Sequence, residues 1–133
     1  MLMIQNDYIL RPLFQLINEI ISKFSEVKFE HIKKREEHIN NLYLKYLEQD
    51  RLFFIKTDVD SFINDKLFTN EKLMILAEMF YCDSLQYKDK GLKTSLLKKA
   101  REILKHISTN DGTYSIEREN KIKLMEKEIS LNK

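Results

Sequence analysis

Residues 69–107 read TNEKLMILAEMFYCDSLQYKDKGLKTSLLKKAREILKHI. Apolar residues recur at spacings of three and four on both sides of a polar centre, which predicts two helices joined by a turn. The first helix is expected to open at Thr69 and to run to about Lys88, and the second to follow a turn at Lys90 and Gly91. An Asn-Asp-Gly sequence at 110–112 is expected to stop the second helix. The residues at this helical spacing, apolar except for Ser84, are Leu73, Leu76, Ala77, Phe80, Ser84, Leu85, Leu92, Leu96, Leu97, Ala100, Ile103, Leu104 and Ile107.

The hairpin resembles the tetratricopeptide pattern W-x2-L-G-x2-Y with its later small and large residues. The matching positions are Leu73, Leu76, Ala77, Phe80, Leu97 and Ala100. Small residues at Ala77 and Ala100 would let two antiparallel helices approach closely. The chain departs from the pattern in three places, because leucine replaces tryptophan, the turn is about four residues too long and Lys93 replaces alanine. No second copy follows at a period of about 34 residues, so the resemblance implies one TPR-like hairpin rather than an array.

Residues 1–50 are expected to form a pair of helices. In the first helix, apolar residues at helical spacing run from Ile9 to Phe24, and Asn6 or Asp7 is the expected N-cap. Pro12 lies beyond the first turn of such a helix. The helix is therefore expected either to kink at Pro12 or to begin its regular part there.

The second helix is expected from about Ser25 to Gln49. Glu36 interrupts its apolar stripe, and we interpret it as a carboxylate that reaches solvent or a lysine rather than as a functional acid. The stripe itself comprises Phe29, Ile32, Ile39, Tyr43, Tyr46 and Leu47.

Residues 51–69 are expected to connect the two halves. The apolar LFFIK should cross the core, and it is the best candidate for a strand in this chain. A short helix is expected across VDSFINDKL, with Thr57 or Asp58 as its cap. Residues 70–133 then hold the hairpin and a closing helix, from about Ser115 to Ser130. The closing helix should bury Ile116, Ile122, Met125 and Ile129.

Composition favours helices throughout. The chain of 133 residues has two glycines and one proline, so it supplies few of the tight turns that a sheet needs. Hydrophobic residues make up 43% and charged residues 33%, which is typical of a globular domain and not of a disordered chain. The expected fold is all-α, a single-domain bundle of about five or six helices over residues 1–133.

The sequence also favours a cytoplasmic location. Cys82 is the only cysteine, so no intramolecular disulfide can form and a reducing compartment is expected. The N-terminus lacks a basic segment followed by an unbroken apolar core, which argues against a secretory signal. No run of about 18 uncharged apolar residues is present, so no membrane helix is expected.

The heptapeptide QNDYILR at residues 5–11 resembles the opening of an uncharacterised bacterial family, whose members begin with QNDYI(L/M)R. The order of elements is similar over most of the chain, although Pro12 departs from the family pattern. The resemblance implies an all-α fold and brings no activity, because the family is catalogued as a domain of unknown function.

No catalytic, cofactor-binding or metal-ligating residue is assigned from sequence motifs. His31 and His38 are seven residues apart, or about 10 Å along a helix, so one metal ion cannot take both. The pair Asp58 and Asp60 lacks the glycine and glutamate of a calcium loop and is better explained by helix capping. The two glycines forbid most phosphate-cradling loops. Cys82 is expected to be a small core residue.

A basic stripe follows the second helix of the hairpin. On a helical wheel Lys90, Lys98, Arg101 and Lys105 cluster opposite Leu96, Ala100, Ile103 and Ile107. The stripe is either a solvated face, paired with acids of neighbouring helices, or a docking surface for an acidic partner. A formal net charge of +2 and the lack of a helix-turn-helix argue against duplex DNA.

The function expected from these features is a non-catalytic protein-interaction module or adaptor. The alternative is an enzyme or small-ligand protein, with a site assembled from scattered residues such as Glu36, His38 and Tyr43. A nucleic-acid binder that uses the basic stripe is the third hypothesis. No cofactor is expected, and leftover apolar surface at the N-terminus could make a homodimer.

Overall fold

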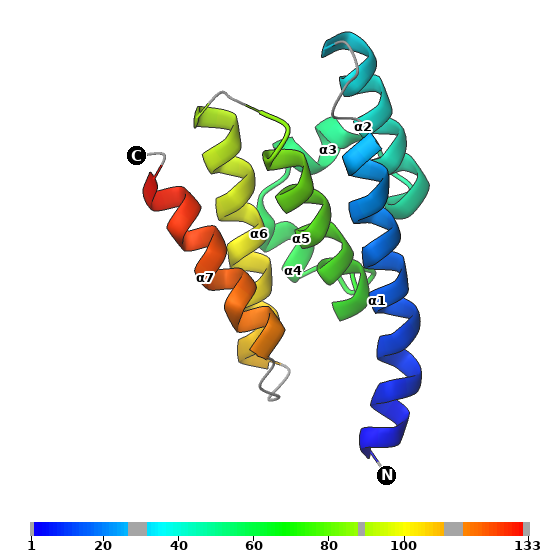
Figure 1. Ribbon diagram of the computed structural model, residues 1–133. Helices are drawn as coiled ribbons and strands as arrows, with labels where there is room; N and C mark the ends of the chain where they lie inside the picture. Colours follow the sequence, from blue (N-terminus) through cyan, green and yellow to red (C-terminus); the bar gives the residue numbers. More distant parts are fainter. Residues whose placement is uncertain (1, 27–31, 88–89, 111–115, 132–133) are drawn as a thin grey trace.

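The computed structural model describes residues 2–26, 32–87, 90–110 and 116–131, with the backbone alone for residues 2–12, 14, 32 and 110. Every regular element within these ranges is an α-helix, so the expected all-α class is confirmed (Figure 1). The helices are α1 (Leu2–Glu26), α2 (Ile32–Leu47), α3 (Arg51–Lys56), α4 (Val59–Ile63), α5 (Asn70–Ser84), α6 (Lys90–Asn110) and α7 (Ile116–Leu131). The described part of the chain holds seven helices rather than five or six, because the connector forms two short ones.

Helices α5 and α6 run antiparallel and form the most extensive contact in the bundle (Figure 1). Thr69 is the N-cap of α5, as expected, since its hydroxyl oxygen accepts a hydrogen bond from the Lys72 amide at 3.2 Å. Ala77 and Ala100 are 1% and 0% exposed, which places two small side chains inside the core. Both alanines of the predicted hairpin are therefore buried, as expected.

The predicted boundaries between these two helices are wrong. Helix α5 ends at Ser84, because turns after it bond the Gln86 amide to the Asp83 carbonyl and the Tyr87 amide to the Ser84 carbonyl. Helix α6 already begins at Lys90, so Lys90 and Gly91 belong to its first turn rather than to the connection. Leu85 follows the end of α5 and is 51% exposed, so it is not a core residue.

The segment LFFIK forms helix α3 and not a strand. Asp50 caps this helix, accepting a hydrogen bond from the Phe53 amide at 2.8 Å. Phe54 is fully buried and contacts the rings of Tyr43, Phe53, Phe62 and Phe68. The segment thus enters the core, as predicted, through a helical turn that the aromatic cluster holds in place.

Asp58 is the N-cap of α4 and was one of the two residues expected there. Its side chain makes no capping hydrogen bond. The helix is shorter than VDSFINDKL and ends at Ile63. Turns follow it, in which the Asp65 amide bonds to the Phe62 carbonyl and the Phe68 amide to the Asp65 carbonyl.

Helix α1 is continuous from Leu2 to Glu26, so the prediction that Asn6 or Asp7 caps it is wrong. Pro12 does not start the helix either, because the helix continues on both sides of it. Proline has no amide hydrogen, so one backbone hydrogen bond of the helix is missing there. The helix packs mainly against α5 and less against α2. Its N-terminal part projects beyond the rest of the bundle (Figure 1). Its described buried side chains are Leu13, Ile20 and Phe24.

Helix α2 differs from the prediction at both ends. Ser25 belongs to α1, and Phe29 lies outside the described residues. The C-terminal end falls at Leu47 because Glu48 adopts a left-handed conformation, with φ of 61°. Ile39 and Tyr43 are buried as expected, while Glu36 is exposed, which agrees with a carboxylate that reaches solvent.

Helix α7 closes the bundle against α6. Ile122, Met125 and Ile129 are buried as expected. Ile116 is 66% exposed, so its assignment to the core is wrong, because it stands at the first position of the helix. None of the helices described here is long and apolar enough to cross a membrane.

Candidate functional site

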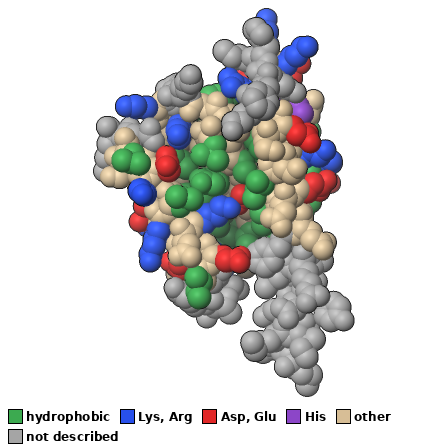
Figure 2. Space-filling view, viewed as in Figure 1, with side chains coloured by type: hydrophobic (Ala, Val, Ile, Leu, Met, Phe, Trp, Pro, Cys, Tyr) green, Lys and Arg blue, Asp and Glu red, His purple; other side chains and the backbone are tan. Residues whose placement is uncertain are grey.

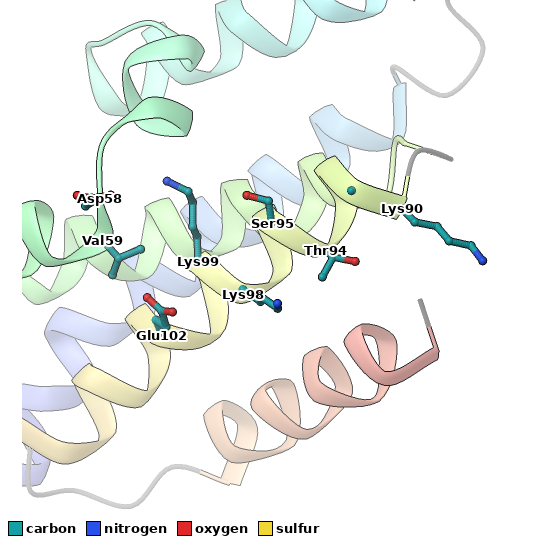
Figure 3. A pocket seen from close by; sticks show the side chains of 9 residues that line it. Asp58, Val59, Lys90, Thr94, Ser95, Lys98, Lys99 and Glu102 are labelled. Carbon is teal, nitrogen blue, oxygen red and sulfur yellow. The ribbon is translucent and has the colours of Figure 1, made fainter. Parts of the chain in front are cut away.

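An open groove of about 620 Å³ lies between the start of α4 and one face of α6 (Figure 3). Helix α6 supplies most of its wall, since residues three and four apart share one helical face. The described residues that line it are Asp58, Val59, Lys90, Gly91, Thr94, Ser95, Lys98, Lys99 and Glu102. Most of these residues carry a polar or charged group, and Val59 is the single aliphatic one among them.

The groove carries opposite charges at its two ends (Figure 3). Lys90 stands at the end formed by the first turn of α6, and Lys98 lies between it and the middle of the helix. Asp58 and Glu102 lie at the other end, where α4 begins. All four side chains are exposed, so a molecule in the groove could contact each of them.

Lys99 joins the two walls of the groove. Its Nζ donates a hydrogen bond to the backbone carbonyl of Thr57 at 2.8 Å and lies 6.0 Å from the centre of the Phe80 ring. Burial lowers the pKa of Lys99, and the nearby charges of Asp58 and Glu102 oppose that change. Lys99 thus ties the residues that lead into α4 to α6 and fixes the width of the groove.

The structure divides the predicted basic stripe. Lys90 and Lys98 line the groove, whereas Arg101 is half-buried and Lys105 is exposed outside its lining. Lys105 instead forms an ion pair with Glu126 of α7, with 2.9 Å between Nζ and Oε1. The predicted opposite face is buried, at Leu96, Ala100, Ile103 and Ile107. The orientation of the helix is therefore as predicted, and Lys90 and Lys98 are the members of the stripe that line the groove.

A second polar cluster is buried where α2, α3 and α5 meet. The carboxylate of Asp83 is 0% exposed and accepts three hydrogen bonds: from the Tyr43 hydroxyl at 2.8 Å, from Arg51 Nε at 2.8 Å and from Arg51 Nη2 at 3.1 Å. Arg51 also donates to the hydroxyl of Tyr87, and its guanidinium lies 5.2 Å from the centre of that ring. This arrangement is a bidentate ion pair with aromatic hydroxyls on both sides.

The electrostatics of this cluster favour a structural role. Burial raises the pKa of Asp83, while the bonds from Arg51 and Tyr43 oppose the rise. Burial alone would lower the pKa of Arg51, but its bonds to Asp83 outweigh that effect and the pKa is raised. Burial also raises the pKa of Tyr43 well above 10.0. Each polar group of the ion pair is engaged by another, as buried charges require.

The structure does not place Glu36, His38 and Tyr43 together in a site that a solute can reach. Tyr43 is 0% exposed, so a solute cannot reach its hydroxyl, which is bonded to Asp83. Glu36 is exposed and His38 is half-buried with an interaction of its own. No group of three or more histidines, cysteines and acids suited to a metal ion is found among the described residues.

A third polar contact links α5 to α7. Lys121 donates to Glu78, which is 5% exposed, and lies 5.2 Å from the centre of the Tyr81 ring. Cys82 is also buried, as expected, with its thiol 3.7 Å from Glu78 Oε1. Burial raises the pKa of the Cys82 thiol far above its usual range, which keeps it protonated and unreactive.

Figure 2 has the same viewpoint as Figure 1. It shows hydrophobic side chains gathered at the centre of the molecule, between α7 and α1.

Sequence reasoning missed Asp58 and Glu102 as members of the groove. Asp58 was interpreted as a helix cap, and Glu102 was given no role. One signal was present, because Glu102 follows Lys98 by four residues and so shares its helical face. Asp83 and Arg51 carried no such signal, since they are 32 residues apart in the chain.

Comparisons of the chain with models of protein families, with curated proteins and with solved structures found no match. The resemblances of QNDYILR and of the hairpin to known families therefore stay predictions.

Proposed function

We propose that this protein is a non-catalytic interaction module, and that it docks an acidic segment of a partner protein along the groove between α4 and α6. The observation that carries the proposal is the position of Lys90 and Lys98, which line the groove and are both exposed. Exposed ammonium groups beside a cavity suit carboxylates, because each lysine offers three donors on a mobile stem.

Two further features support an interaction module rather than an enzyme. The buried polar cluster around Asp83 is closed to solutes and bonded internally, so it offers no free acid or base. The hydrophobic side chains gathered between α7 and α1 in Figure 2 are typical of a surface that binds protein. The antiparallel pair α5 and α6 also fits the TPR-like hairpin expected from the sequence, which we retain as part of this proposal.

The proposal is tested with a fluorescent peptide of eight glutamates, whose binding is followed by anisotropy at low salt. The variant Lys90→Glu/Lys98→Glu is expected to bind at least about tenfold more weakly, because two favourable charge contacts become repulsive. The matched control is Lys123→Glu/Lys127→Glu on α7, since both lysines are exposed and the change in net charge is the same. The control should bind within about twofold of the wild type.

Equal losses in the two variants would assign the effect to net charge and contradict a docking site in the groove. A single-stranded oligonucleotide of the same charge is measured in parallel. If it binds more tightly than the peptide and depends on the groove lysines, the nucleic-acid hypothesis replaces this proposal.

A further inference from the structure

We infer that the groove between α4 and α6 recognises a mixed-charge segment, in which an acidic block is followed at a fixed distance by a basic block. The acidic block would lie at Lys90 and Lys98, and the basic block at Asp58 and Glu102. This inference rests on the proposed function and names the chemistry of the partner.

The first step of the argument is the separation of charge along α6. Lys90, Lys98 and Glu102 line the same groove in this order along one helix. A rise of 1.5 Å per residue places Glu102 about 18 Å from Lys90 along the helix axis. Asp58 reaches the same end as Glu102 from the start of α4, so the acids come from two elements (Figure 3). The groove is therefore bipolar rather than uniformly basic.

The second step is that Lys99 forms no ion pair with either acid, although its positive charge lies near both of them. Its Nζ is held by the Thr57 carbonyl at 2.8 Å, and it is half-buried. Asp58 and Glu102 are both exposed, and neither carboxylate forms an ion pair with Lys99. A cation from a partner can therefore reach both carboxylates while Lys99 keeps its bond to Thr57.

The third step is the shape of the groove, which suits an extended chain. Sites for small molecules enclose most of the ligand, whereas this groove is open to solvent. A span of about 18 Å corresponds to five or six residues at about 3.3 Å each. Ser95 is exposed between the ends and offers a hydroxyl to a peptide backbone. Opposite charges at both ends would also fix the direction and register of such a segment.

The test compares three labelled peptides of equal length on the full chain. The first has two glutamates, a spacer of four glycines and serines, and two lysines. The second replaces the lysines by glutamates, and the third alternates glutamate with lysine so that composition is kept while the blocks are lost. We expect the first peptide to bind about three- to tenfold more tightly than either of the others, as one or two additional charge contacts allow.

The decisive variant is Lys98→Glu/Glu102→Lys, which exchanges two exposed charges one turn apart and leaves the composition of the protein unchanged. It should lose the preference for the block peptide, because the charges along the groove then alternate. Glu102→Lys alone should weaken the block peptide and strengthen the all-acidic one. Circular dichroism melting should be nearly unchanged for both variants, since exposed charges contribute little to stability.

Two results separate this inference from the proposed function. If the all-acidic peptide binds as tightly as the block peptide and Glu102→Lys has no effect on the block peptide, the acidic end takes no part and the inference is overturned, while the basic docking site stands. If no peptide binds and the groove variants change nothing, both are overturned.

Discussion

The replacement of Asp83 by alanine is predicted to be among the most destabilising single changes in this chain. Asp83 is fully buried and accepts hydrogen bonds from Tyr43 and twice from Arg51. Without the carboxylate, the guanidinium of Arg51 would remain inside the bundle with a side-chain exposure of only 15%. The loss is therefore the penalty of an unpaired buried charge, in addition to the hydrogen bonds themselves.

Removal of one partner from a buried ion pair costs about 3–5 kcal/mol. An unfolding entropy of about 2.1 cal/mol/K per residue gives about 0.28 kcal/mol/K for this chain, so Tm should fall by roughly 11–18 °C. Domains have free energies of unfolding of about 5–15 kcal/mol. If the wild type lies at the lower end of that range, Asp83→Ala should be only partly folded at about 37 °C. Tyr43→Phe removes one hydrogen bond to the same carboxylate and should cost about 1.5–3 kcal/mol.

The assay is urea unfolding followed by circular dichroism, with Arg51→Met/Asp83→Leu as the informative double variant. Exchange of both charges for apolar groups should recover the part of the loss that comes from the unpaired charge. The buried Tyr43 hydroxyl still loses its acceptor in this variant, which should cost about 1–3 kcal/mol. If Asp83→Ala lies within about 1 kcal/mol of the wild type, or if the double variant is no more stable than the single one, the reasoning about an unpaired charge is wrong.

Four further predictions concern stability and reactivity. Burial raises the pKa of Tyr43 well above 10.0, so the folded state retains a proton that the unfolded state releases above about pH 10. Stability should therefore fall as the pH rises above about 10, and Tyr43→Phe should reduce that slope in melting curves. Ala77→Leu and Ala100→Leu should each cost about 1–3 kcal/mol by overpacking, and two variants that melt at or above the wild-type Tm would refute the close hairpin. Glu48→Gly should raise stability by about 1 kcal/mol, because glycine adopts the left-handed conformation without the penalty of a Cβ atom, and a lower urea midpoint would contradict this. Cys82, the only thiol, should react with Ellman's reagent at pH 8 at least about 100-fold more slowly in the folded protein than in urea, and rapid labelling of the native state would show that the thiol is accessible.

The elements that the sequence predicted well are those specified by local information. Thr69 opens α5 because its hydroxyl accepts from an amide three residues later, and that bond depends on neighbouring residues alone. The periodic apolar positions of α6 likewise defined the face that is buried, from Leu96 to Ile107. The same periodicity placed Lys90 and Lys98 on the face that lines the groove.

The elements that the sequence predicted poorly depend on residues far apart in the chain. LFFIK has the composition of a strand, but the rings of Tyr43, Phe62 and Phe68 pack around Phe54 and fix it as a helix. The place of Asp58 in the groove could not be predicted, because α4 is held beside α6 by a contact across 42 residues, from Lys99 to the Thr57 carbonyl. Such contacts leave no periodic trace in the sequence.

The ion pair of Arg51 and Asp83 also has a consequence for the order in which the chain is made. Tyr43 and Arg51 precede Asp83 by 40 and 32 residues. At a synthesis rate of about 5–20 residues per second, they leave the ribosome roughly two to eight seconds before their partner does. During that interval the N-terminal half holds a guanidinium and several phenylalanines that have no complete core around them. The first half of this chain is therefore expected to fold only after α5 has been synthesised. A nascent fragment that ends before Asp83 should be a better substrate for chaperones than the finished protein.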